Sequence, residues 1–420
     1  MTGTSPRGRS TAFLQGRAGR RVSAVCAALG AFAIVSSGLA PSAVAADVQS
    51  KQWYLDLMDA KGMWKVSTGK GVKVAVLDTG VNPDTPSLKG QVLVDGVHQA
   101  LSYNATNDYV GHGTSMAELI AGTGAGGGLQ GLAPGAKVVP YRVLTQDVKN
   151  KTDVKKTPST AAVIKAVADS DVQIISMSFG GDTMDPDEAK AVKYAESKGK
   201  LMFASTGNNA KTKNFIGYPA ADPYVVGVAA ADKDGKVADY SEHGNYVDLA
   251  APGLHVPLWC DETFKSYCDS GGTSAATALT SASAALIWSA HPTWTANQVL
   301  ATLIDTAGRD WPKNKPSNYL GYGLIRPRKV LENSGINPGA AGTDPLSFEN
   351  GTGVTGASPS ASASTSSKAP NPTSGGQTSA AASSSDSSGN TTLWVALGAA
   401  AAVVVLGGGA FAVARSRRGA

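Results

Sequence analysis

Three residues have side chains that together could perform nucleophilic catalysis: Asp78, His112 and Ser274. A serine hydroxyl is a weak nucleophile at neutral pH and needs an adjacent base. Histidine titrates near neutrality, so His112 could take the proton of Ser274 and return it to a leaving amine. The carboxylate of Asp78 would hold the imidazole tautomer and stabilise the imidazolium. Attack on a peptide carbonyl would create an oxyanion, which needs hydrogen-bond donors close to the nucleophile.

Each of these residues also has a structural explanation. Asp78 opens Asp-Thr-Gly, a good turn after a strand. His112 could cap or pack, and Asn208 could occupy a left-handed turn position. Ser274 follows Gly-Gly and precedes a small-residue helical stretch, where serine commonly caps free N–H groups. These explanations and the catalytic one are compatible, and we expect Ser274 to be both helix start and nucleophile.

The elements that must position these residues alternate between apolar runs and helical patterns. Strands that are apolar on both faces, alternating with helices, predict an α/β fold with a doubly wound, mostly parallel sheet and helices on both faces. Sites in such sheets lie at the carboxyl ends of strands, where Asp78 and Asn208 stand. The predicted strands are 72–77, 138–144, 172–178, 201–206 and 224–230, and two predicted helices are 159–170 and 186–199.

At these residues the sequence resembles the subtilisin-like serine peptidases. Asp-Thr-Gly (78–80), His-Gly-Thr (112–114) and Gly-Thr-Ser (272–274) match the three catalytic signatures of that family in its order. The resemblance covers nearly all of 52–333. It implies a subtilisin-like endopeptidase that hydrolyses proteins or peptides through an acyl-enzyme, with an oxyanion hole at Asn208 and Ser274. It also implies a substrate-binding segment that consists of Ser178, Phe179 and Gly180.

The order of the triad separates this family from another serine hydrolase class. An α/β-hydrolase would run serine, acid, histidine, and its G-x-S-x-G elbow needs a glycine where this chain has Ala276. The chain departs from the subtilisin pattern at Ser115 and Glu118, which follow the histidine signature. A glutamate where a glycine packs is expected to change a helix contact, without loss of activity.

Both ends of the chain predict export and anchoring. Residues 1–46 have the basic start, apolar run and small-x-small site of a signal peptide, with a retained membrane anchor as the alternative. An uncharged run followed by three arginines predicts a single transmembrane helix over 393–414 and a cytoplasmic basic tail over 415–420. A buried core helix is the alternative for that run. The catalytic domain would then be extracellular, on the cell membrane.

The remainder divides into an N-terminal extension (47–71), a peptidase domain (72–335) and a disordered linker rich in Ser, Ala, Gly and Thr (336–392). Residues 351–392 contain 13 serines and no aromatic residue, a composition that cannot bury enough surface to fold. Removing the eight terminal arginines from the formal charge of +5 leaves −3 for 47–392. The exported part therefore has no excess of basic residues, which argues against nucleic acid as a partner.

Two cysteines remain after export, Cys260 and Cys268, and an oxidising compartment favours a disulfide between them. Two buried free thiols are the alternative. No cofactor or metal-binding residue is predicted. Calcium is common in the resembled family, but no acidic cluster has EF-hand spacing, so no calcium ligands can be assigned. The remaining histidines have no partner pattern and are predicted to be structural or on the surface: His98, His243, His255 and His291.

A charged insertion over 147–156 predicts a solvated loop, with self-cleavage as a hypothesis. The whole layout also resembles the mycosins, the membrane-anchored subtilases of type VII secretion. That resemblance implies secretion-channel components as partners and an extension (47–71) that braces the head. Two functions stay open: an anchored endopeptidase that processes exported proteins, and a scaffold that clamps a secretion channel with catalysis dispensable.

Overall fold

The computed structural model describes residues 45–146, 148–347 and 349–350. Most of the predicted signal peptide, the linker beyond 350, the transmembrane helix and the basic tail lie outside these residues. Within the described part of the chain, no helix is both long enough and apolar enough to cross a membrane.

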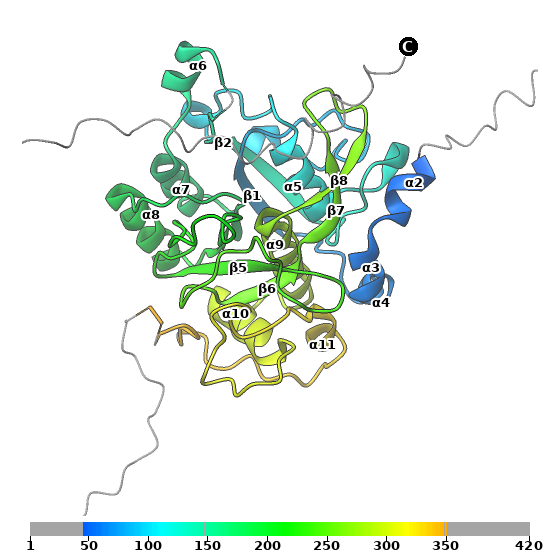
Figure 1. The fold of residues 1–420 in the computed structure, drawn as a ribbon, viewed down its shortest axis with the longest axis vertical. Helices are drawn as coiled ribbons and strands as arrows, with labels where there is room; N and C mark the ends of the chain where they lie inside the picture. The colour runs from blue at the N-terminus through cyan, green and yellow to red at the C-terminus, as the bar shows by residue number, and fades with distance from the viewer. Residues whose placement is uncertain (1–44, 147, 348, 351–420) are drawn as a thin grey trace, which may run out of the picture. The chain divides into compact units, whose positions relative to one another are not determined.

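A six-stranded parallel sheet forms the centre of the fold, with the strand order β2-β1-β3-β4-β5-β6 (Figure 1). Its strands are mostly buried, as expected when helices cover both faces. The predicted α/β class with a mostly parallel sheet is therefore confirmed. The strands are β1 (Lys73–Asp78), β2 (Lys137–Arg142), β3 (Ile174–Met177), β4 (Leu201–Ser205), β5 (Val225–Ala231) and β6 (Leu249–Pro252).

Side chains alternate across each strand and so feed two separate cores. Val74 and Val76 of β1 join the core that contains helices α5 (His112–Ala121) and α9 (Thr273–Ala290). Ala75 and Leu77 join the core under α7 (Thr160–Ala168) and α8 (Pro186–Ser197), which lie together at one flank in Figure 1. Further helices are α10 (Ala296–Thr306), α11 (Pro327–Leu331) and the short 3₁₀ helices η1 (Val94–Gly96), η2 (Gln99–Leu101) and η3 (Ala125–Gly127).

The N-terminal extension packs against the head. It forms three short helices, and Tyr54 and Met63 are buried there. The buried Gln52 side chain accepts a hydrogen bond from Gln130 N at 2.9 Å and donates one to Gln130 O at 2.8 Å. Trp53 Nε1 donates to the carbonyl of His255 at 3.0 Å. The three helices are α2 (Ala45–Ser50), α3 (Trp53–Leu57) and α4 (Ala60–Met63), and these contacts fasten the extension at α3, at α4 and at Gln52 just before α3.

Two segments are more ordered than the sequence predicts. Residues 336–350 were assigned to the linker, but Leu346 is buried and Asn350 Oδ1 accepts a hydrogen bond from Tyr224 N at 3.1 Å. Burial of Leu346 and this hydrogen bond hold the end of the segment against the head, although its composition is mostly polar. The charged insertion is not only a loop, because it contains the exposed helix α6 (Lys151–Lys156), which begins where the Asn150 side chain accepts from Thr152 N.

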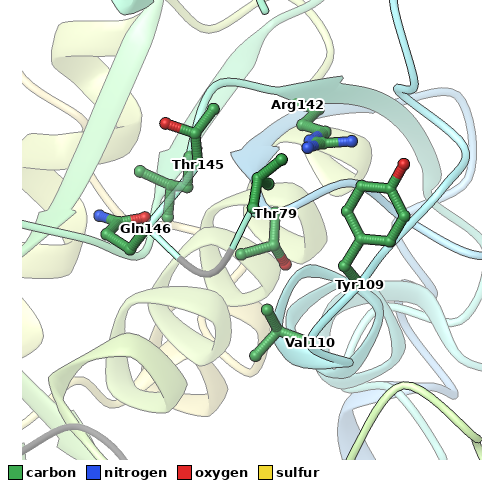
Figure 2. Close-up of a pocket in the computed structure, with 8 residues that line it drawn as sticks. Thr79, Tyr109, Val110, Arg142, Thr145 and Gln146 are labelled. Atoms are coloured by element: carbon green, nitrogen blue, oxygen red, sulfur yellow. The ribbon is translucent and has the colours of Figure 1, made fainter. Parts of the chain in front are cut away.

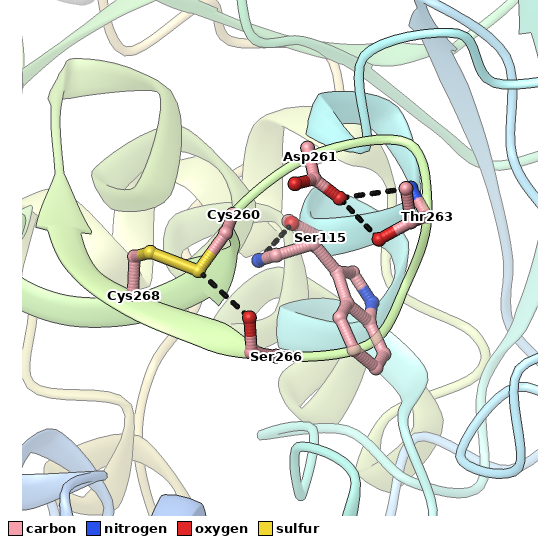
Figure 3. The surroundings of a disulfide bond; sticks show 7 residues. Ser115, Cys260, Asp261, Thr263, Ser266 and Cys268 are labelled. Atoms are coloured by element: carbon pink, nitrogen blue, oxygen red, sulfur yellow. Dashed lines mark hydrogen bonds between the residues drawn. A yellow bond between two sulfur atoms is a disulfide. The ribbon is translucent and has the colours of Figure 1, made fainter. Parts of the chain in front are cut away.

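An antiparallel hairpin of β7 (Leu254–Trp259) and β8 (Tyr267–Gly271) leads into α9. Cys260 and Cys268 close its loop with a disulfide, with the Cα atoms 5.1 Å apart (Figure 3). Ser115 of α5 accepts a hydrogen bond from Trp259 N at 2.9 Å. Glu118, one turn further along α5, accepts from Tyr267 Oη at 2.7 Å. Both departures from the family pattern therefore join α5 to this hairpin.

Glu118 is fully buried and also accepts a hydrogen bond from Thr85 Oγ1 at 2.8 Å. Burial raises the pKa of this carboxyl from 4.5 to about 7, although hydrogen bonds from Tyr267 and Thr85 act in the opposite direction. The folded chain therefore retains a proton over a pH range where the unfolded chain has released it. This group's contribution to stability is full below about pH 4.5 and is lost as the pH rises through about 7.

We predict that Glu118→Gln changes the pH dependence of stability, because glutamine does not titrate. The melting temperature of the wild-type chain minus that of the variant should fall between pH 5 and pH 8. Thermal unfolding of both proteins at the two pH values measures this, and contributions of other carboxyls cancel in the difference. A difference that does not vary with pH would contradict the assignment.

Candidate active site

Asp78 and His112 form a direct hydrogen-bonded pair. Asp78 ends β1 and is fully buried, whereas His112 begins α5 and its side chain is 28% exposed. Asp78 Oδ1 accepts from His112 Nδ1 at 2.7 Å and from Thr79 N at 2.8 Å. Because Nδ1 is used in this pair, Nε2 is the ring nitrogen left to accept a proton. The sequence predicted this pairing from the order of the motifs.

The charge state of His112 depends on two carboxylates. Burial disfavours the imidazolium, but the charge and hydrogen bond of Asp78 and the charge of Asp108 favour it, and the pKa of His112 is raised above 6.5. A general base must be neutral before it acts, so the raised pKa sets the acidic limit of catalysis by this imidazole.

Asp108 organises the site, although no sequence motif singled it out. Its Oδ1 accepts hydrogen bonds from Thr79 Oγ1 at 2.8 Å and from Gly111 N at 2.8 Å. Its Oδ2 accepts from Thr114 N at 2.8 Å. The buried carboxylate thus joins the end of β1 to the first turn of α5, where a negative charge is favourable. An aspartate just before a predicted helix start was the available signal.

Ser274 is the second residue of α9 and is 8% exposed. Its hydroxyl donates to Ser178 O at 2.9 Å, and Ser178 Oγ donates to Ser274 O at 3.1 Å. The prediction that Ser274 lies at the helix start is confirmed, but Ser274 does not cap the helix, because the N-cap residue is Gly272 and no side chain caps it. The described contacts join Asp78 to His112 and Ser274 to Ser178, with no hydrogen bond between the two pairs. Transfer of a proton to His112 requires the hydroxyl to rotate, as serine hydroxyls readily do.

Two glycines before Ser274 are required by the backbone. Gly271 and Gly272 have φ of 139° and 138°, a region that L side chains rarely adopt. A Cβ on Gly271 would also lie 2.1 Å from the carbonyl oxygen of Gly253. This close approach lets β8 turn directly into α9, which carries Ser274.

Asn208 follows β4 and lies beside the start of α9. Its Oδ1 accepts from both the N and the Oγ1 of Thr273 at 3.0 Å. The N–H of Thr273 can only donate, so the Asn208 atom that faces it is the amide oxygen. With its oxygen occupied by the residue before Ser274, Asn208 has its Nδ2 group left to donate. This is the arrangement that an oxyanion-hole donor needs.

The predicted substrate segment follows β3. Ser178 is buried, Phe179 is half-buried and Gly180 is exposed. The next residue, Gly181, exchanges backbone hydrogen bonds with Tyr218 at 2.9 and 2.8 Å. Gly180 and Gly181 also line a hollow of about 220 Å³. The segment therefore connects the neighbourhood of Ser274 with an open hollow.

Arg142 is a second residue that the sequence did not single out. It ends β2, pairs in register with Asp78 and is fully buried. Its guanidinium lies 4.3 Å from the centre of the Tyr109 ring, beside a cavity of about 10 Å³ that Thr79 also lines (Figure 2). Its three side-chain nitrogens have no hydrogen-bond partner among the described residues. The aromatic ring stabilises the cation, and the cavity has room for about one water molecule.

The sequence predictions also concern possible metal ligands and the histidines other than His112. In the described ranges, no group of three or more His, Cys, Asp or Glu side chains could hold a metal ion. His243 stacks on Tyr319, and His291 stacks on Trp294. His255 Nδ1 lies 2.9 Å from Asp269 at an exposed position of the hairpin. These three contacts are structural or on the surface, as predicted.

The Subtilase family model, Peptidase_S8, matches residues 69–323. This chain belongs to the subtilase family. Thermitase from Thermoactinomyces vulgaris is 30% identical over 279 residues, which cover 64% of this chain and 95% of thermitase. Minor extracellular protease Epr from Bacillus subtilis is 31% identical over 284 residues, which cover 66% of this chain and only 41% of Epr. The chain is a subtilisin-like serine endopeptidase.

A solved structure extends the comparison. MycP3 protease from the type VII (ESX-3) secretion system is 27% identical with a TM-score of 0.54, and the match covers 66% of this chain and 87% of MycP3. The comparison therefore agrees with the parallel sheet and the helices around it.

We predict that Asp108→Asn shifts the acidic limb of the kcat/KM profile to lower pH. Loss of the Asp108 charge lowers the pKa of His112, so the neutral base persists to lower pH. The asparagine side chain has one accepting oxygen where aspartate has two, so one of the groups that donate to Asp108 is left unpaired. This loss should lower the free energy of unfolding by about 1–3 kcal/mol. A pH–rate profile with a peptide substrate and thermal unfolding measure the two effects. The exposed Asp95→Asn is the control, and an unmoved acidic limb would contradict the role of Asp108.

Proposed function

We propose that this protein is an exported, membrane-anchored endopeptidase in which Asp78, His112 and Ser274 act as the catalytic triad. The 2.7 Å contact between Asp78 Oδ1 and His112 Nδ1 is the observation that carries the proposal. That contact orients a ring whose second nitrogen is free, and the carboxylate stabilises the imidazolium that forms during reaction.

The reaction runs in two halves. A substrate strand lies along Ser178, Phe179 and Gly180, and the Ser274 hydroxyl leaves the Ser178 carbonyl to attack the scissile carbon. His112 Nε2 takes the hydroxyl proton as the new C–O bond forms. The carbonyl oxygen becomes an oxyanion, which accepts hydrogen bonds from Asn208 Nδ2 and Ser274 N.

Collapse of this intermediate breaks the peptide C–N bond, and His112 gives its proton to the departing amine. The carbonyl carbon is now esterified to Ser274 Oγ. A water molecule then attacks the ester while His112 takes one of its protons. The second collapse releases the carboxyl product and returns the proton to Ser274, so the enzyme is regenerated without a cofactor.

The anchored location rests on residues outside the described part of the chain. The basic and apolar features of 1–46 favour export, and the uncharged run over 393–414 with its following arginines favours one span with the C-terminus in the cytoplasm. The serine-rich stretch between the head and this run would hold the head away from the cell membrane, on the outer side.

The proposed physiological role is processing of exported proteins of a type VII-like secretion system. The similarity to MycP3 supports this role, together with the predicted signal, linker and span. The second candidate is a scaffold that clamps the secretion channel without need of catalysis. The packed N-terminal extension favours this scaffold role, because an extension that is hydrogen-bonded to the head is compatible with a rigid surface for docking to the channel.

We predict that a fluorophosphonate probe labels the full chain on Ser274. An assembled triad raises the nucleophilicity of one serine above that of all others. Mass spectrometry of the digested adduct locates the label, and Ser274→Ala is the control. Folded protein that stays unlabelled, or that is labelled at another serine, would overturn the proposed triad.

Export assays separate the two candidate roles. We predict that cells with Ser274→Ala accumulate unprocessed substrates of the secretion system, because the variant lacks the nucleophile while it keeps the fold. Intact mass of secreted proteins measures this. Normal processing in the Ser274→Ala strain, with export lost only when the whole chain is deleted, would favour the scaffold instead.

A further inference from the structure

The hollow beside the substrate segment has an acidic side. It measures about 220 Å³, and Gly180 and Gly181 of the substrate segment lie along it. Two carboxylates, Asp185 and Glu188, line it together with the rings of Phe179 and Tyr218. The remaining lining side chains, Gln146 and Thr183, are neutral. Aromatic faces and carboxylates together suit the long apolar stem and charged head of a lysine or arginine side chain.

No lysine or arginine in the described part of the chain neutralises these carboxylates. Neither Asp185 nor Glu188 has an ion pair within 4.0 Å among the described residues, whereas nearby Asp182 and Asp187 pair with Lys213 and Lys190. Asp185 uses its Oδ1 to cap α8, where it accepts from the N–H groups of Asp187 and Glu188. Its position at the edge of the hollow is therefore fixed by the helix start.

A third carboxylate adds to the negative charge. Asp222 is 4% exposed, and no described residue forms a hydrogen bond with its Oδ1. Burial and the charges of Asp222 and Asp185 raise the pKa of Glu188 to about 7. Burial and the charge of Asp185 likewise raise the pKa of Asp222 to about 6. The fold thus holds three mutually repelling carboxyls at one place, and a bound cation would relieve that repulsion.

The number of residues between Ser178, which contacts Ser274, and Gly181 at the hollow indicates which substrate residue would reach it. Ser178 contacts Ser274, and Gly181 lies three residues further along the chain. An extended substrate paired with this segment advances about 3.3 Å per residue, so the hollow lies about 10 Å along the substrate. This corresponds to the third or fourth residue from the scissile bond.

We propose that Glu188 and Asp185 make the protease selective for a lysine or arginine at the third or fourth residue from the scissile bond. The inference rests on the proposed function, because it needs the substrate to lie along Ser178, Phe179 and Gly180. The substrate side chain would enter the hollow with its stem against Phe179 and Tyr218, and its charged end would reach the carboxylate of Glu188.

Fluorogenic peptides test this with the full chain as the enzyme. One lysine is moved through the first five positions on each side of the scissile bond of an otherwise neutral peptide, and glutamine replaces it in the reference peptides. We expect kcat/KM to rise about fivefold or more over glutamine at a third or fourth position only. Glu188→Gln should remove most of this ratio, and Asp185→Asn, which keeps the helix cap, should reduce it.

A charge-reversal variant distinguishes a loss of selectivity from a loss of folding. Glu188→Lys should prefer glutamate over lysine at the same position, a gain that a damaged fold cannot produce. Asp187→Asn is the matched control, since Asp187 is exposed on the same helix and pairs with Lys190. It should keep the wild-type ratio.

Two other results would overturn the proposal. Equal rates for lysine and glutamine peptides at every position, with normal hydrolysis and Ser274 labelling, would refute the selectivity and leave the endopeptidase assignment intact. Absence of both hydrolysis and labelling would refute the proposed function and this inference together.

Discussion

The hydrogen bond between the carboxylate of Asp78 and the imidazole of His112 requires two backbone segments to meet at a fixed distance. Asp78 is the last residue of a central parallel strand, and His112 is the first residue of a helix that covers that strand. Neither segment can shift without loss of the 2.7 Å contact. Asp108 holds them together by accepting hydrogen bonds from both sides, so one buried carboxylate positions the pair although it does not touch the imidazole.

Helix α5, which begins with His112, is also held by Ser115 and Glu118, two residues that differ from the common subtilisin pattern. Ser115 and Glu118 bind the hairpin of β7 and β8, which leads directly into α9 and Ser274. The disulfide closes the tip of that hairpin. The helix that carries His112 and the helix that carries Ser274 are therefore connected through one hairpin. Replacing a small residue by a buried glutamate is tolerated because Thr85 and Tyr267 both donate to it.

Much of the fold and the site followed from local sequence. Strands apolar on both faces predicted a parallel sheet, and helices over 159–170 and 186–199 agree with α7 and α8 to within two residues. The short strand β6 was missed because its four residues, Leu-Ala-Ala-Pro, have neither length nor β-branched side chains to identify it. Helix α6 was missed because a six-residue charged helix buries no apolar face.

The missed site residues act through contacts that sequence spacing cannot reveal. Asp108 joins segments separated by tens of residues, and its neighbours in sequence resemble an ordinary turn. Arg142 at a strand end would be expected to reach solvent, yet it is fully buried against Tyr109. The hydroxyl of Ser274 was expected to face His112, and the structure instead directs it to Ser178. Each of these outcomes depends on tertiary packing.

The most direct measurement is a crystal structure of the protein after reaction with a phosphonate inhibitor. We expect phosphorus on Ser274 Oγ, one phosphonyl oxygen within hydrogen-bond distance of both Asn208 Nδ2 and Ser274 N, and His112 Nε2 facing Ser274 Oγ while Nδ1 stays on Asp78. An unmodified Ser274 that still donates to Ser178, or an adduct whose oxygen is turned away from Asn208, would contradict catalysis by this triad.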